Sequence, residues 1–225
     1  MNDLLVILPC TQEYGLMPEY LRQLREAEID VHVERLESIP NGNAGGTHAY
    51  ALDIYRRCAQ RFDNYRNLVF SDAFDVLFYG TKEEVLGKIP FDRVLLAAER
   101  NCYPDPSLSS SIPGKTPWRF ANGGLACGTP ESFLKWVEEI EKHPLYAPSG
   151  LNQRFYNLLL AMGFPLVSID ATTDLFYCLF LEEGELDFQN GLPINKLCRT
   201  RPNFLHFNGK CFHPGVLARR EASLA

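Results

Sequence analysis

The sequence has no long hydrophobic run and no run of basic residues longer than two. Its 28 acidic and 22 basic residues give a net charge of −6, which argues against nucleic acid or an anionic membrane as the main partner. No apolar run reaches the roughly 18 residues that a membrane-spanning helix needs. The N-terminal segment lacks the basic start of a secretory signal, so we expect no membrane span and a cytoplasmic location.

The seven cysteines are scattered, odd in number and free of any Cys-x-x-Cys pair. A zinc site and a disulfide framework are therefore disfavoured, and reduced thiols in a cytoplasm-like compartment fit best. Internal repeats, low-complexity tracts and linkers are also absent from the sequence. With 225 residues and 46% hydrophobic content, the chain is expected to form a single domain over residues 1–225.

Apolar segments alternate with polar loops and amphipathic helical patterns, which predicts an α/β fold with a mixed, mostly parallel sheet flanked by helices. Strands near residues 4–9, 68–71 and 94–98 are expected at the centre of the sheet. The segment 81–84 is a capping box for a short helix. A long polar loop over residues 100–117 is expected to be a lid, a binding loop or disordered. The segment 120–124 is expected to precede a short apolar run.

Two aspartates follow the buried strand expected at residues 68–70. Asp72 and Asp75 would lie at the carboxyl edge of the sheet, where open α/β sheets bind ligands. Two carboxylates at one place repel each other unless a cation lies between them, and their oxygens suit Mg²⁺ or Mn²⁺, which usually also carry substrate phosphates. The alternative is a turn in which both aspartates only bond the local backbone.

A glycine-containing loop precedes the helix expected to carry Leu52, Tyr55 and Ala59. Gly45 and Gly46 would let backbone N–H groups approach a phosphate at the helix N-terminus. The spacing matches neither of the common phosphate-loop motifs, so a plain loop is an equal alternative.

A short apolar strand near the C-terminus leads to His206, and an Asn208-Gly209 turn and Lys210 follow. A lone histidine is more often a hydrogen-bonded structural residue than a ligand. Here the strand end could bring the imidazole to the aspartates, and two carboxylates with one imidazole suit manganese. Lys210 could then neutralise a diphosphate, so that metal and lysine would stabilise a departing nucleoside diphosphate.

Taken in order, these motifs resemble the glycosyltransferase domain of the multifunctional procollagen lysyl hydroxylases. The resemblance covers residues 4–214 and rests on Thr11 and Glu13, the segment 24–28, Gly45-Gly46, Asp72 and Asp75, Ala98-Glu99 with Cys102 and Pro104, Arg119-Phe120 with Asn122-Gly123-Gly124, Gln153 with Phe155-Tyr156, and His206. It implies a GT-A-type (Rossmann-like) fold, Mn²⁺ with Mg²⁺ as the alternative, and a UDP-sugar donor. Nothing resembles the hydroxylase's iron-binding domain, so no iron or 2-oxoglutarate activity is expected.

The resemblance also implies roles for individual residues. Asp72, Asp75 and His206 would be the metal ligands. The contacts to the uridine side of the nucleotide would be Thr11, Phe74 and the Gly45-Gly46 loop with His48. The contacts to the diphosphate would be Asn208, Gly209 and Lys210. The catalytic positions would be Asn152, Glu99 and Asn122, and residues 99–103 would begin a mobile loop over the sugar site.

The sequence departs from the family pattern at several positions. His48 stands where the family has a lysine, Tyr103 stands where it has a tryptophan, and the spacer before Lys210 is shorter. An acidic pair becomes Leu151-Asn152, and an asparagine cannot act as a base or as a carboxylate nucleophile.

Three functions remain open. The first is a glycosyltransferase that passes a hexose from a UDP-sugar to an unknown acceptor, such as a hydroxylysine-linked or glycan hydroxyl. The second, favoured by Asn152 and His48, is a UDP-sugar-binding module with little or no transfer. The third is a nucleotide-sugar hydrolase.

Overall fold

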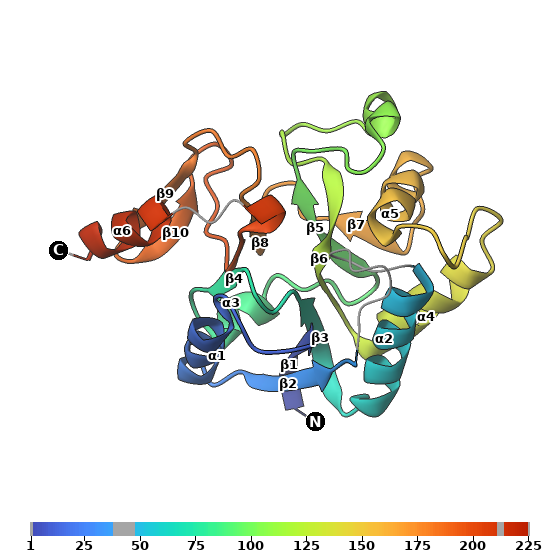
Figure 1. Ribbon diagram of the computed structural model, residues 1–225, viewed down its shortest axis with the longest axis horizontal. Coiled ribbons are helices and arrows are strands. Elements are labelled where there is room, and N and C mark those ends of the chain that lie inside the picture. The colour runs from blue at the N-terminus through green and yellow to red at the C-terminus, as the bar shows by residue number, and fades with distance from the viewer. Residues whose placement is uncertain (1, 38–47, 211–213, 225) are drawn as a thin grey trace.

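The computed structural model describes residues 2–37, 48–210 and 214–224. Its main sheet has six strands in the order β2-β1-β3-β6-β5-β7, which Figure 1 shows running through the molecule. The pairs β1–β2, β1–β3 and β5–β7 are parallel, and β6 is antiparallel to both β3 and β5. The strands are β2 (Asp30–Arg35), β1 (Asn2–Cys10), β3 (Tyr65–Ser71), β6 (Phe120–Gly128), β5 (Val94–Glu99) and β7 (Val167–Ile169).

This arrangement confirms the predicted mixed, mostly parallel sheet. The three strands expected at the centre are β1, β3 and β5, and none of them is an edge strand. Strand β6 differs from the expectation, because the segment 120–124 does not precede the strand but forms its first half. Glycines are depleted in strands unless another group approaches closely, and such an approach occurs at this position, as described below.

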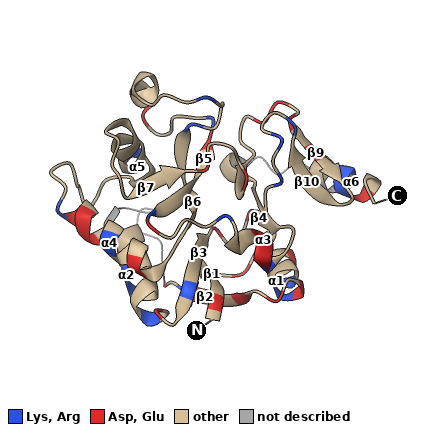
Figure 2. Ribbon diagram, turned by 180° about the vertical axis from the view of Figure 1, so that it is seen from behind, with Lys and Arg blue, Asp and Glu red and all other residues tan. Residues whose placement is uncertain are grey.

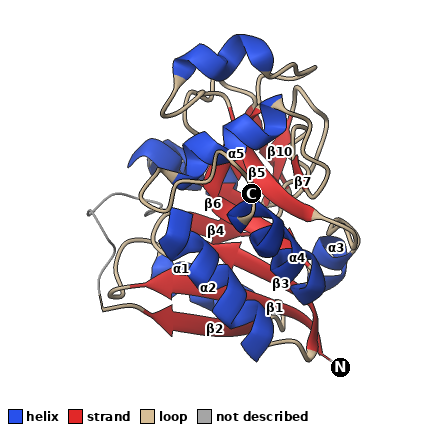
Figure 3. Cartoon of the chain, turned by 90° about the vertical axis from the view of Figure 1, so that its right-hand side faces the viewer, coloured by secondary structure: helices blue, strands red, loops and turns tan. Residues whose placement is uncertain are grey.

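Helices cover both faces of the sheet, which explains why β1 is apolar without alternation. Leu5 and Ile7 belong to a core cluster shared with α2 (His48–Arg61), α4 (Pro130–Glu141) and α5 (Asn152–Ala161). Leu4 and Val6 face α1 (Met17–Glu26) and α3 (Lys82–Leu86). Figures 1 and 3 show α2 and α4 side by side over one face of the sheet. The capping box predicted at residues 81–84 begins α3.

A second, three-stranded sheet has the order β4-β11-β8. Strand β11 (Phe204–His206) pairs antiparallel with β4 (Val76–Phe78) and parallel with β8 (Phe176–Cys178). The strands expected before His206 and near residues 175–181 are thus present, the latter shorter than expected. This sheet carries His206 to the segment that follows β3.

Three elements near the C-terminus were not predicted: the hairpin of β9 (Leu186–Gln189) and β10 (Leu192–Asn195), and helix α6 (Pro214–Ala222). Asn190 and Gly191, with φ of 52° and 75°, form the hairpin turn, a dipeptide that signals this turn type. The 100–117 loop contains a short 3₁₀ helix over Pro106–Ser111. Charged residues of both signs are spread along the helices and loops (Figure 2). Within the described residues, no helix has the length and apolar character needed to cross a bilayer.

Candidate functional site

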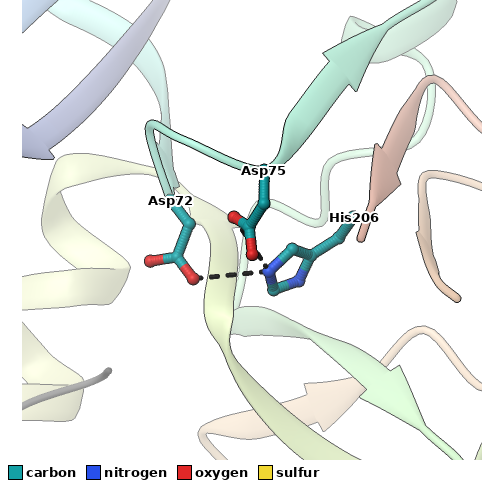
Figure 4. Close-up of side chains that lie close together, drawn as sticks. All are labelled: Asp72, Asp75 and His206. Atoms are coloured by element: carbon teal, nitrogen blue, oxygen red, sulfur yellow. Dashed lines mark ion pairs between the residues drawn. The ribbon is translucent and has the colours of Figure 1, made fainter. Parts of the chain in front are cut away.

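Asp72, Asp75 and His206 converge at the carboxyl end of β3. The Nε2 atom of His206 lies 3.4 Å from Oδ2 of Asp72 and 3.5 Å from Oδ1 of Asp75, and the ligand atoms of all three lie within 4.8 Å of one another. Figure 4 shows both carboxylates turned toward the imidazole. The His206 side chain is 2% exposed, whereas those of Asp72 and Asp75 are 46% and 39% exposed, so the group is open on its carboxylate side.

Strand pairing creates this group. The register of β11 with β4 sets His206 opposite Val76, directly after Asp75, and the backbone N–H of Phe207 donates to the carbonyl of Asp75. Burial alone would lower the pKa of His206, but the carboxylates of Asp75 and Asp72 raise it well above its usual value. Without a cation, the imidazole therefore holds a proton between the two carboxylates.

Gly124 of β6 lies directly against this group. A Cβ atom at this position would lie 2.4 Å from Cε1 of His206 and 2.5 Å from Oδ2 of Asp72, distances that real Cβ contacts do not reach. The Gly124 carbonyl also accepts a hydrogen bond of 2.7 Å from the backbone N–H of Asp72. Glycine is therefore the residue that allows β6 to pass directly beneath His206 and Asp72.

A cavity of about 90 Å³ opens beside Asp72, between α2, α5 and β6. Its lining includes Tyr50 and Tyr55 of α2, Gly123 of β6 and Asn152 at the start of α5. Asn152 is 5% exposed, and its Oδ1 accepts a hydrogen bond from the backbone N–H of Gln153. The helix N-cap is Leu151, so Asn152 is the first helical residue and not a cap.

Glu99 ends β5 and is 3% exposed. Its carboxylate accepts hydrogen bonds from the side-chain amides of Gln153, Asn208 and Asn122. Burial raises the pKa of Glu99 to about 7, although His206 and the three amides act in the opposite direction. Glu99 and Asn122 thus lie together behind the site, away from solvent.

The nucleotide-binding positions inferred from the resemblance differ in how accessible their side chains are. Thr11 is exposed after β1, and the ring of Phe74 is covered by Tyr14, with ring centroids 3.8 Å apart. Asn208 turns its amide inward to Glu99, and Gly209, with φ 68°, packs against the ring of Phe180. Gly45 and Gly46 lie outside the described residues, as do the side chains of His48 and Lys210.

Two residues of the site were not predicted. Tyr14, half exposed and stacked on Phe74, lies near both aspartates, and burial together with their charges raises its pKa. Cys178 of β8 places its Sγ 3.7 Å from Nδ1 of His206. The sequence offers no sign of Cys178, because it lies inside an apolar run.

Known proteins show similarity over most of the chain. Residues 1–211 match the family model described as PLOD GT domain. A multifunctional procollagen lysine hydroxylase and glycosyltransferase of Caenorhabditis elegans is 27% identical over 93% of this chain and 31% of that protein. A procollagen-lysine,2-oxoglutarate 5-dioxygenase of Drosophila melanogaster is 31% identical over 54% of this chain and 19% of that protein. The chain therefore spans about a third or less of the length of these relatives.

Similar solved structures include a glycosyltransferase involved in glycosylation of the major capsid of PBCV-1, with a TM-score of 0.49 and 12% identity over 98% of each chain. The bifunctional glycosyltransferase WbbM has a TM-score of 0.48 and 11% identity over 92% of this chain and 46% of its own. The family match confirms the resemblance predicted from the motifs, and the mixed sheet is the GT-A-type arrangement that it implied. Because the family model covers residues 1–211 of 225, the chain belongs to the PLOD GT domain family of glycosyltransferase domains.

Proposed function

We propose that this chain transfers a hexose from a UDP-sugar to a hydroxyl acceptor, with a divalent cation held by Asp72, Asp75 and His206. The observation that carries the proposal is the convergence of these side chains beside a cavity at the carboxyl edge of the sheet. This edge is where α/β sheets bind nucleotides.

The donor set fits a divalent cation. Two carboxylate oxygens and one imidazole nitrogen face a common point, and the mixture of oxygen and nitrogen favours manganese over magnesium. A cation at this point supplies positive charge where a departing diphosphate develops negative charge. His206 must release its Nε2 proton to become a ligand, so binding is expected to strengthen as pH rises.

The surrounding residues suit a nucleotide-sugar. The ring pair of Tyr14 and Phe74 offers an aromatic face beside the aspartates, on which a nucleobase can stack. The cavity between α2 and α5 offers the Asn152 amide and two tyrosine rings, a mixture that suits sugar hydroxyls and the apolar face of a pyranose ring. An amide at position 152 can bond a hydroxyl but cannot take a proton.

The second candidate is a UDP-sugar-binding module with little transfer. It is favoured by Asn152, because an amide faces the cavity where the family pattern has a carboxylate. Release of UDP from a panel of UDP-sugars, with Mn²⁺ and with or without hydroxyl acceptors, separates the candidates. Acceptor-dependent release supports a transferase and acceptor-independent release a hydrolase, whereas tight binding without release supports a binding module. Absence of both binding and release contradicts the proposal.

A further inference from the structure

We propose that Glu99 is a positioning residue. Its buried carboxylate holds β6, the start of α5 and the turn after β11 at fixed positions around the donor site, and it does not itself transfer a proton. The inference rests on the proposed function only for the identity of the ligand, a UDP-sugar. Its structural part depends on four side chains from four segments: Glu99 of β5, Asn122 of β6, Gln153 of α5 and Asn208 after β11.

Each of the three amides is oriented by a backbone N–H group. The side-chain oxygen of Asn122 accepts from the N–H of Gly124 at 2.9 Å, and that of Asn208 accepts from the N–H of Phe180 at 3.0 Å. The oxygen of Gln153 accepts from the N–H of Gly123 at 3.3 Å. With their oxygens committed, the amides present their NH₂ groups to Glu99.

A carboxylate at position 99 matches three converging donors because an ionised carboxylate only accepts hydrogen bonds. Its Oε2 accepts from Nδ2 of Asn208 at 2.6 Å, its Oε1 accepts from Nε2 of Gln153, and the Asn122 amide also bonds it. A glutamine would bring one NH₂ group against other NH₂ groups. The orientation of the network therefore selects an acid at this position.

The network joins the parts of the site that must keep their spacing. Asn122 fixes the backbone of Gly124, which passes beneath Asp72 and His206. Gln153 fixes the start of α5, where Asn152 faces the cavity. Asn208 fixes the turn that directly follows β11.

A proton-transferring role would need Glu99 to reach the substrate. The side chain is 3% exposed, and both of its oxygens already accept hydrogen bonds from side-chain amides. A buried polar network is costly when only some of its groups are hydrogen-bonded. Glu99 therefore serves to hold these amides in place.

The test uses Glu99→Gln and the swapped double variant Glu99→Gln with Gln153→Glu. In the double variant, a carboxylate at 153 can accept from both the new glutamine and the N–H of Gly123, while the glutamine oxygen accepts from Asn208. Amide exchange of Gly123 and Phe180, measured by NMR without nucleotide at pH 8, reports the network directly. UDP affinity with Mn²⁺ reports its consequence. Glu138→Gln on the exposed face of α4 is the control.

Glu99→Gln is expected to speed exchange at Gly123 and Phe180 and to weaken UDP binding, each by about tenfold, and the swap to restore most of both. If Glu99→Gln does not fold, recovery of the fold in the double variant supports the same role. Normal exchange and normal UDP affinity combined with lost turnover would overturn the proposal in favour of proton transfer. Failure of the swap to restore either measurement would also overturn it. Failure of the wild type to bind UDP would contradict the proposed function, while the exchange data would still decide the role of Glu99.

Discussion

Nδ1 of His206 lies 3.7 Å from Sγ of Cys178 on the neighbouring parallel strand. Because Nε2 faces the aspartates, a cation there leaves the ring proton on Nδ1, and Cys178 is its hydrogen-bond partner within the described part of the chain. Such outer partners of metal-binding histidines contribute about tenfold or more to metal affinity. We expect Cys178→Ala to weaken Mn²⁺ binding by about tenfold and Cys178→Ser, which keeps an acceptor, to weaken it less. Calorimetric titration with Mn²⁺ checks this, and equal affinities in all three proteins would contradict it.

Gly124 and Gly123 form a matched pair for testing how closely β6 approaches the site. Alanine at 124 would press on His206 and Asp72, whereas a Cβ at 123 would meet Asn152 at an ordinary 3.4 Å. Gly124→Ala is therefore expected to weaken Mn²⁺ binding by about tenfold or more, because the ligands must move, and Gly123→Ala to leave it nearly unchanged. Circular dichroism would verify that both variants fold. Similar metal affinities in the two variants would show that the close approach is unimportant.

Glu99 predicts a pH dependence of stability. Burial raises its pKa from 4.5 to about 7, so between these values the folded chain binds a proton that the unfolded chain has lost. The contribution of Glu99 to the free energy of unfolding is complete below pH 4.5 and is lost as pH rises through about 7. The loss amounts to up to about 3 kcal/mol. Glu99→Gln should remove this component. Urea unfolding of the metal-free protein at pH 5 and pH 8 measures it, and an equal pH difference in wild type and variant would refute it.

Asn152 limits turnover if the proposed function is correct. Asn152→Asp is expected to raise the rate of UDP release at saturating donor by about tenfold or more, with little change in nucleotide affinity, because a carboxylate can accept a proton or stabilise positive charge at the anomeric carbon. Asn64→Asp, at an exposed position in the turn after α2, is the matched control. A wild type that already turns over briskly, or a variant that is no faster, would show that another group limits the reaction.

Local patterns predicted much of this fold. The apolar run of β1 and the capping box at Thr81 each depend on neighbouring residues, and each is found where the sequence indicates it. The meeting of Asp72 and Asp75 with His206 was also predictable, because the aspartates follow one apolar strand and His206 ends another. The sequence did not indicate that these two strands belong to separate sheets.

The remaining features depend on pairings between distant segments. Cys178 meets His206 because β8 and β11 pair in a particular register, which neither strand encodes alone. Tyr14 reaches Phe74 through a turn in which Gly15 has φ 63° and Leu16 donates to the carbonyl of Phe74. The Asn122-Gly123-Gly124 segment was expected to precede an apolar run, whereas it lies inside β6. The close approach of His206 explains the glycine at 124.

Binding of UDP with and without Mn²⁺, compared between wild type and Asp75→Asn, tests the central claim most directly. Loss of one carboxylate weakens the cation's hold, and in the metal-free protein it also removes the ion pair between Asp75 and the protonated imidazole of His206. The variant is therefore expected to fold without gaining stability. Calorimetry should show Mn²⁺-dependent UDP binding by the wild type and its loss in Asp75→Asn. Unchanged UDP affinity in the variant, or equal affinity with and without Mn²⁺ in the wild type, would contradict a metal-dependent nucleotide site formed by Asp72, Asp75 and His206.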